Sequence, residues 1–195
     1  MNYQPFEPGR YYHLYNRGNN RESLFLDVEN YWFILKLIKK HWLPWLNVYS
    51  YCLLPNHFHF VIRIKEAHKL PDSWQDGQSA IHQPFANCFN AYTKAINKRY
   101  HRTGSLFQEH LKRIEITNEE YLQNLIIYIN TNPDKHQVAS SPDYRFSSYQ
   151  SLLSTKPSHL CRTEVIELFG DTENLKYMLE KQQYNLSLIN ELTFE

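Results

Sequence analysis

Two neighbouring runs of strand-forming residues constrain the fold of this chain more than any other feature. The first run is LNVYSYCLL (46–54) and the second is HFHFVIRI (57–64), so only Pro55 and Asn56 separate them. Both runs are rich in β-branched and aromatic residues, and a Pro-Asn pair favours a tight turn. The segment therefore predicts two adjacent antiparallel strands.

The second of these strands has two chemically different faces. Because successive strand side chains point to opposite sides of a sheet, His57 and His59 share one face. The other face carries Phe58, Phe60 and Ile62. We therefore expect one face to pack in the core and the histidine face to carry chemistry.

The remaining elements complete a split β-α-β pattern. Apolar spacing and end signals predict a strand, a helix capped by Asp27, a second helix, a second strand and a third helix that Pro133 ends. In chain order these segments are 10–18, 27–42, 82–100, 111–116 and 119–132. With the hairpin they give the order β-α-β-β-α-β and one more helix. This order predicts an α+β fold, an antiparallel sheet with helices on one face, plus C-terminal helices.

Beyond residue 136 the sequence predicts a helical appendage. Residues 134–154 have the pattern of a loop that leads into a short helix, and residues 163–183 have the spacing of two more helical pieces. We expect a core domain over residues 1–136 and a C-terminal helical appendage over residues 137–195.

Composition favours a globular protein of the cytosol. The net charge of +1 gives no sign of a nucleic-acid partner by itself. The N-terminus lacks an apolar signal core and we find no run of about 18 apolar residues, so we expect neither export nor a membrane span. The three cysteines lack metal-type spacing and are expected to be reduced thiols: Cys52, Cys88 and Cys161.

One segment is locally basic and interleaved with the aromatic residues Tyr92, Tyr100 and Phe107. Its only acid between residues 94 and 113 is Glu109, against six cations: Lys94, Lys98, Arg99, Arg102, Lys112 and Arg113. A groove for single-stranded nucleic acid needs cations that contact phosphates and rings that stack on bases. A solvated helix end, basic because of the helix dipole, explains the same residues equally well.

The histidine pair and the third helix supply candidate catalytic groups. Neutral imidazole binds divalent metals, so His57 and His59 can converge on one ion. The helix places Tyr128 beside its apolar stripe, at the border of core and solvent, with Asn132 one turn later. A metal held by the two histidines and the Asn132 oxygen would activate Tyr128 as a nucleophile. Structural roles stay open, as a packed histidine pair and an amphipathic tyrosine with a wet hydroxyl.

Five motifs occur in a characteristic order over about residues 10–150. They are YHLYNRGNNRESLF (12–25), LLPNHFHFVI (53–62), YTKAINKRYHRTGSLFQ (92–108), YINTNPDKH (128–136) and YRFSSY (144–149). In these motifs the chain resembles the single-tyrosine HUH transposases, in particular the REP-associated tyrosine transposase branch. Five ordered motifs are far more specific than His-x-His alone.

The resemblance implies a ferredoxin-like core with a site for a divalent metal, Mg²⁺ or Mn²⁺. It assigns the metal-binding histidine pair to His57 and His59. It assigns the nucleophile to Tyr128 and the polar third ligand to Asn132.

Other positions of the motifs are assigned to structure. Tyr92 and Tyr100, which lie in the basic motif, match positions of packing or DNA contact. Gln137 stands where relatives often have Gly, which alters a turn but removes none of the implied chemistry.

The activity that the resemblance implies is metal-dependent cleavage and strand transfer of single-stranded DNA. Tyr128 would attack a phosphodiester and form a 5′-phosphotyrosine intermediate, with hairpin-bearing DNA as the substrate. Transesterification retains the bond energy, so no ATP is expected, and the sequence has no P-loop pattern. The implied setting is the bacterial cytoplasm, on DNA, as a monomer or homodimer.

Three other functions remain open at this point. The first is a domesticated nucleic-acid-binding protein that keeps the fold but does not cut. The second is a phosphodiester hydrolase in which water attacks and Tyr128 is structural. The third is a helix-rich interaction protein with an accidental His-x-His.

Overall fold

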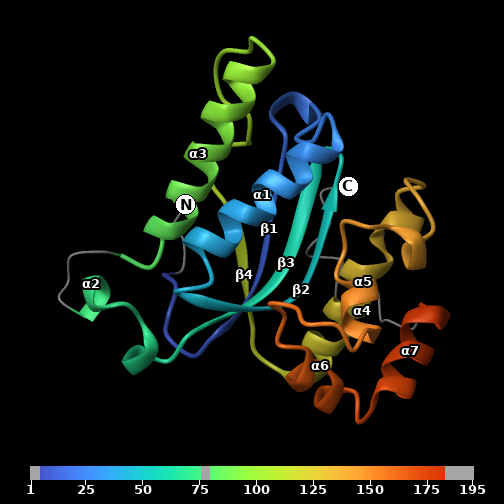
Figure 1. Cartoon of the computed structure of the whole chain (residues 1–195). Coiled ribbons are helices and arrows are strands. Elements are labelled where there is room, and N and C mark those ends of the chain that lie inside the picture. The colour runs from blue at the N-terminus through green and yellow to red at the C-terminus, as the bar shows by residue number, and fades with distance from the viewer. Residues whose placement is uncertain (1–4, 76–79, 183–195) are drawn as a thin grey trace.

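Four antiparallel strands form the centre of the molecule, and the computed structural model describes residues 5–75 and 80–182 (Figure 1). The strands are β1 (Tyr11–Arg17), β2 (Leu46–Leu54), β3 (His57–Ile64) and β4 (Lys112–Ile116), in the spatial order β2-β3-β1-β4. The predicted hairpin, the β-α-β-β-α-β order and the α+β class are therefore confirmed. Within the described ranges, no helix is both long and apolar enough to cross a bilayer.

Two long helices cover the face of the sheet that carries Phe58 and Phe60. They are α1 (Val28–His41) and α3 (Gln83–Arg99), and both lie in front of the sheet in Figure 1. Phe58 stacks on Phe89 of α3, with the ring centroids 5.5 Å apart. Just after α1, Trp42 packs edge-on against Phe60 at 5.1 Å. The helices of the split β-α-β unit thus share one face, as predicted.

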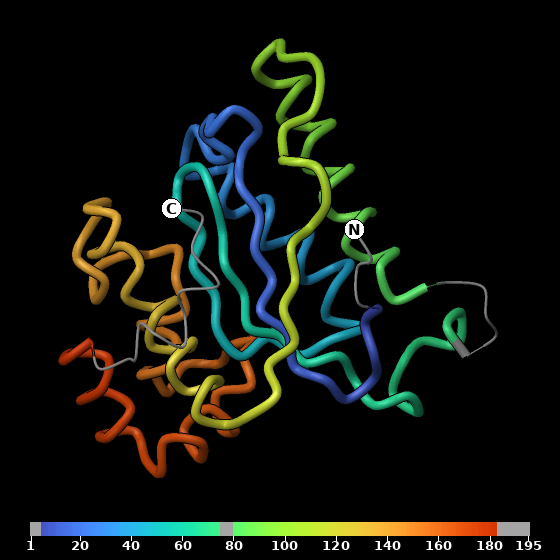
Figure 2. Tube along the Cα trace, turned by 180° about the vertical axis from the view of Figure 1, so that it is seen from behind, coloured from blue at the N-terminus to red at the C-terminus, as the bar shows by residue number. Residues whose placement is uncertain are grey.

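A further long helix, α4 (Glu119–Lys135), lies on the opposite face. It packs mainly on β2, and its Tyr128 meets His59 of β3. The C-terminal helices gather on the same side of the molecule (Figures 1 and 2): α5 (Tyr149–Leu153), α6 (Arg162–Leu168) and α7 (Thr172–Lys181). Because α7 also contacts α4, helix α4 is enclosed on more than one side.

Short helical turns complete the described chain. They are α2 (Asp72–Gln75) and three 3-10 turns at Asn19–Arg21, Ala67–Lys69 and Ser141–Asp143. The predicted cap of α1 is confirmed, since the carboxylate of Asp27 accepts a hydrogen bond from the N–H of Asn30 at 3.0 Å.

Pro133 lies inside α4, so the predicted helix end at residue 132 is wrong. A proline lacks an N–H and costs the helix one hydrogen bond. In α4 that loss falls in the last turn, and the following N–H of His136 still donates to the carbonyl of Asn132 at 2.9 Å. Pro133 itself is buried, so tertiary packing holds the turn in helical form.

Residues 144–148 tie the C-terminal part of the chain to the edge strand β2. The N–H of Leu53 donates to the carbonyl of Phe146 at 2.9 Å, and the N–H of Ser148 donates to the carbonyl of Tyr51 at 2.9 Å. The segment thereby covers an edge that β2 would otherwise expose. These bonds cross residue 136, and the division into domains at that residue stays a prediction.

Candidate active site

His57 and His59 lie side by side on the face of β3 that α4 covers. Their ring centroids are 5.3 Å apart and the rings are nearly perpendicular, at 89°. The two side chains are buried, with 8% and 2% of their surface exposed. The strand alternation read from the sequence therefore places both imidazoles in one enclosed site.

Two residues, one on α4 and one at its C-terminal cap, contact this pair. Tyr128 meets His59 with ring centroids 6.1 Å apart, and His136, next to the end of α4, meets His57 at 4.7 Å. Asn132 is one turn from each and so lies between the two contacts. It is fully buried, and neither its Oδ1 nor its Nδ2 atom has a hydrogen-bond partner among the described residues. An amide left unpaired in this way points to a ligand.

Burial keeps the histidine pair neutral. It lowers the pKa of His57 to about 3, with smaller contributions from the nearby charges of His136 and Arg17. The pKa of His59 also lies well below its usual value, again because of burial first. Neutral imidazole is the form that binds metals.

A neighbour orients the ring of His57. Its Nδ1 atom lies 2.7 Å from the side-chain oxygen of Asn56. Since an amide oxygen only accepts, Nδ1 carries the proton and donates, and the lone pair of Nε2 is left for a ligand.

The donor set of two neutral imidazoles and one amide oxygen fits a divalent cation. Imidazole and carbonyl oxygen are ordinary ligands of such ions. In the described part of the chain, no three His, Cys, Asp or Glu side chains form a metal-binding group. A metal at this site therefore depends on the unpaired amide of Asn132.

Tyr128 is buried, which corrects the expected position at the border of core and solvent. Only 2% of its surface is exposed. The amino group of Lys135 lies 4.9 Å from the centre of the Tyr128 ring, as a cation over its face. The helical period alone misjudged the exposure because α4 packs on the sheet and also against α7.

Two of the six predicted DNA-contacting cations form ion pairs with acids near the start of α1. Arg99 donates to Asp27 at 2.8 Å, and Arg102 donates to Glu22. Lys94 and Lys98 are exposed one turn apart on α3.

Tyr92 and Tyr100 have structural partners. The hydroxyl of Tyr92 is buried and donates to the carbonyl of Leu24 at 2.8 Å. Burial raises the pKa of Tyr92 well above its usual value. The hydroxyl of Tyr100 donates to Asp27. The resemblance assigned these positions to packing or DNA contact, and both contacts are of the packing kind.

Strand alternation separates Lys112 from Arg113. Lys112 pairs opposite Tyr15, which itself pairs with His59, so Lys112 points to the histidine side. Arg113 points to the other face, where its guanidinium lies 4.5 Å from the ring centre of Phe6. The two cations therefore do not share one groove.

Sequence reasoning missed three residues at the site. His13 of β1 is fully buried, and its Nε2 atom lies 2.9 Å from Nδ1 of His59. Lys135 and His136 complete the end of α4. A spacing of seven residues, two helical turns, relates Lys135 to Tyr128 and could have indicated their contact. Nothing local could have indicated His13, because its contact depends on which strand pairs with β3.

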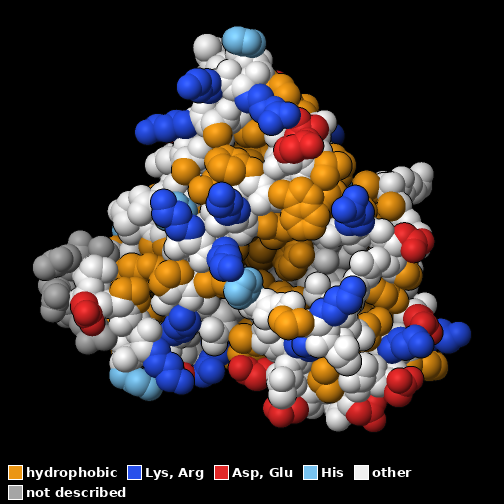
Figure 3. Space-filling view, viewed as in Figure 1, with side chains coloured by type: hydrophobic (Ala, Val, Ile, Leu, Met, Phe, Trp, Pro, Cys, Tyr) orange, Lys and Arg blue, Asp and Glu red, His pale blue; other side chains and the backbone are white. Residues whose placement is uncertain are grey.

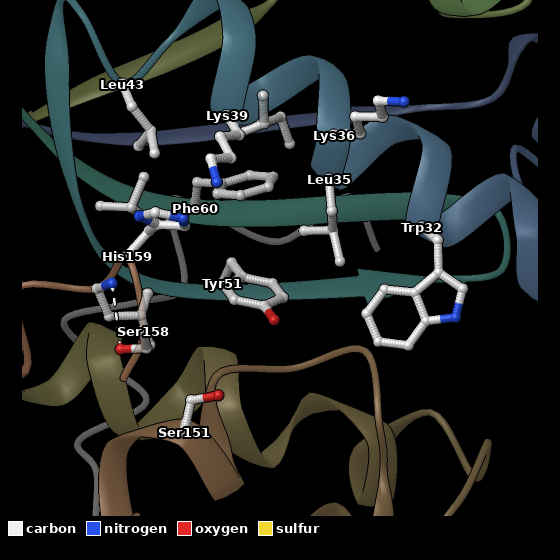
Figure 4. A pocket seen from close by; sticks show the side chains of 13 residues that line it. Trp32, Leu35, Lys36, Lys39, Leu43, Tyr51, Phe60, Ser151, Ser158 and His159 are labelled. Carbon is white, nitrogen blue, oxygen red and sulfur yellow. Dashed lines mark hydrogen bonds between the residues drawn. The ribbon is translucent and has the colours of Figure 1, made fainter. Parts of the chain in front are cut away.

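A separate apolar cavity lies on the opposite side of the sheet. Figure 3 shows hydrophobic side chains in a hollow on the face that carries α1, with Lys and Arg side chains around it. The cavity has a volume of about 350 Å³, and its lining includes Tyr51, Phe60, Trp32, Lys36 and Lys39 (Figure 4). Phe60 points away from the face of His57 and His59, so this cavity is not part of their site.

Comparison with known proteins gives a relationship of fold. No protein-family model and no curated protein matches the chain. Among solved structures, the chain is similar to a REP-associated tyrosine transposase bound to a REP hairpin, with a TM-score of 0.60 and 17% identity over 80% of this chain and 88% of that chain. The chain therefore shares the fold of that tyrosine transposase.

Proposed function

We propose that the protein cleaves single-stranded DNA with Tyr128 as the nucleophile and transfers the cut strand. The observation that carries the proposal is the alignment of Tyr128 and Asn132, one turn apart on α4, against the buried neutral pair His57 and His59. A structural role alone does not explain why Asn132 is buried with both polar atoms unpaired.

The same residues would hold a divalent cation, Mg²⁺ or Mn²⁺. The donors would be Nε2 of His57, an imidazole nitrogen of His59 and the side-chain oxygen of Asn132. When bound, such an ion polarises a phosphoryl oxygen and helps a neighbouring hydroxyl lose its proton.

The reaction is a transesterification. The phenol oxygen of Tyr128 forms a bond to phosphorus and loses its proton, and the bond from phosphorus to the 3′ oxygen breaks. The 3′ oxygen takes up a proton, and the 5′ phosphate stays on the tyrosine. Attack by a 3′-hydroxyl of another strand reverses the step, so strand transfer needs no ATP.

The substrate class follows from the fold relationship and the surface charge. The similar solved structure is that of a transposase with a REP hairpin. In this chain, exposed Lys94 and Lys98 supply cations on α3, and Lys135 supplies one directly over Tyr128. Hairpin-bearing single-stranded DNA is the ligand that we assign.

One observation favours a second function, binding of DNA without cleavage. Tyr128 is only 2% exposed, so little of its side chain is open to a phosphate in this structure. A tyrosine that stays enclosed in this way would leave a bound hairpin intact.

Denaturing electrophoresis distinguishes the two functions. The protein is incubated with labelled hairpin-bearing single-stranded DNA and Mn²⁺, in wild-type, Tyr128→Phe and Tyr177→Phe forms. Tyr177 is half exposed on α7, far along the chain from the site, and serves as the matched control. We expect a metal-dependent protein–DNA adduct in wild type and Tyr177→Phe and none in Tyr128→Phe.

Other outcomes contradict the proposal. Cleavage without an adduct in any of the three proteins would mean that water attacks. Hairpin binding without cleavage in all three would establish the binding function instead.

A further inference from the structure

His13 forms the innermost contact of the histidine site. It lies on β1, which pairs with β3, and it is fully buried. Its ring is nearly parallel to that of His59, with centroids 5.1 Å apart and an angle of 12° between the planes. The contact between His13 Nε2 and His59 Nδ1 is a hydrogen bond of 2.9 Å.

Such a bond between two neutral imidazoles contains one proton. The nitrogen that carries this proton decides whether Nε2 of His59 has a lone pair for a ligand. If His13 donates, His59 carries its own proton on Nε2 and has no lone pair there for a metal. If His59 donates from Nδ1, its Nε2 lone pair is free. Only the second arrangement is compatible with His59 as a ligand through Nε2.

The second arrangement has a cost that the first does not have. It places the proton of His13 on Nδ1, and this atom is buried without a hydrogen-bond partner among the described residues. An unpaired buried N–H is unfavourable. Packing alone therefore favours the first arrangement, and the second is expected where a ligand takes the Nε2 lone pair of His59.

His57 offers a parallel within the same site. Its Nδ1 donates to the side-chain oxygen of Asn56, which leaves Nε2 free. In metal sites a second residue commonly fixes the proton and the orientation of each histidine ligand in this way.

We infer that His13 is a positioning residue, which accepts the Nδ1–H hydrogen bond of His59 and so presents Nε2 of His59 to a divalent cation. The inference rests on the proposed function, because it assumes that His59 is a ligand. It adds a residue from β1 to the groups on β3 and α4.

The first test is calorimetric titration of the DNA-free, full-length protein with Mn²⁺. His13→Gln keeps a side-chain oxygen that can accept from His59, whereas His13→Leu keeps the bulk and removes the acceptor. Tyr12→Phe is the matched control, a buried neighbour on β1 that points to the other face and also loses a hydroxyl contact. We expect His13→Leu to weaken Mn²⁺ binding by about 10- to 100-fold, and His13→Gln and Tyr12→Phe to bind much like wild type.

The second test reads the proton directly and needs no variant. In the ¹⁵N spectrum of the wild-type protein with Zn²⁺, a diamagnetic probe, Nδ1 of His59 should carry the proton. A bare Nδ1 on His59 would overturn the inference, even if His13→Leu failed to fold.

The outcomes separate this inference from the proposed function. Wild-type binding of Mn²⁺ with equal affinity in His13→Leu would refute the role of His13 and leave the metal site standing. Absence of Mn²⁺ binding in wild type would refute both. Equal weakening in His13→Gln and His13→Leu would show that the site needs the imidazole for its shape, which also overturns the inference.

Discussion

The ring of Tyr128 meets the ring of His59 at 6.1 Å, almost perpendicular to it, across the contact between α4 and β3. These two residues lie far apart in the sequence, and each belongs to a different predicted motif. Together with the packing of α4 on β2, their contact fixes which residues of α4 face β3. It thereby also places Asn132, one turn further on, against the histidine pair.

Stability of the metal-free protein should fall as the pH is lowered from about 6.5 to about 3. Burial lowers the pKa of both His13 and His57 to about 3, so the unfolded chain binds protons at these residues before the folded protein does. Below pH 6.5 protonation therefore favours unfolding, by about 1.4 kcal/mol per pH unit for each such histidine. Urea unfolding at several pH values measures this slope.

The variant His57→Gln tests whether the histidine site causes this pH dependence of stability. His57→Gln should show a shallower dependence than wild type below pH 6.5 and a similar one above it. Identical profiles for the two proteins would mean that His57 is readily protonated in the folded state.

Gly18→Ala should destabilise the protein by about 1–3 kcal/mol, because the new methyl group has no room beside the backbone of Glu22. A Cβ atom at Gly18 would lie 2.0 Å from the carbonyl oxygen of Glu22. The N–H of Gly18 also donates to the carbonyl of Asn56 at 2.8 Å, directly beside His57. Thermal unfolding is the measurement, with the exposed neighbour Ser23→Ala as a neutral control. An unchanged midpoint for Gly18→Ala would show that the loop adapts without cost.

Lys135→Ala should weaken hairpin DNA binding by roughly tenfold. The slope of log K against log salt concentration should become shallower by about one, as expected for the loss of one phosphate contact. The physical reason is the exposed cation over Tyr128, where the reacting phosphate would lie. Fluorescence anisotropy at several salt concentrations gives both quantities. Lys181→Ala removes an exposed lysine at the end of α7 and should change neither. If the two variants behave alike, Lys135 contacts no phosphate.

Gln137→Gly should stabilise the protein by about 0.5–1 kcal/mol. Gln137 follows the end of α4 with a φ of 53°, a left-handed conformation that side chains with a Cβ rarely adopt. Glycine adopts it without strain. Gln137→Ala keeps the Cβ atom and should bring no gain, so a stabilised alanine variant would point to the lost amide instead of the backbone. Urea unfolding distinguishes the two.

Much of the fold could be predicted because its signals are local. The hairpin at 46–64, the cap at Asp27 and the shared face of His57 and His59 each follow from a few neighbouring residues, and all three are confirmed. The end of α4 was predicted wrongly, because the breaking tendency of Pro133 is a local signal that buried packing overrides.

By itself, the sequence determined the type and order of the strands and long helices and which side chains share a face, since periods of 2.0 and 3.6 residues are properties of the local backbone. The tertiary structure alone decided that Tyr128 is buried and that His13 bonds to His59. Each of these depends on which strands pair and on which helices enclose α4. Such contacts join residues distant in the chain, and no local pattern encodes them.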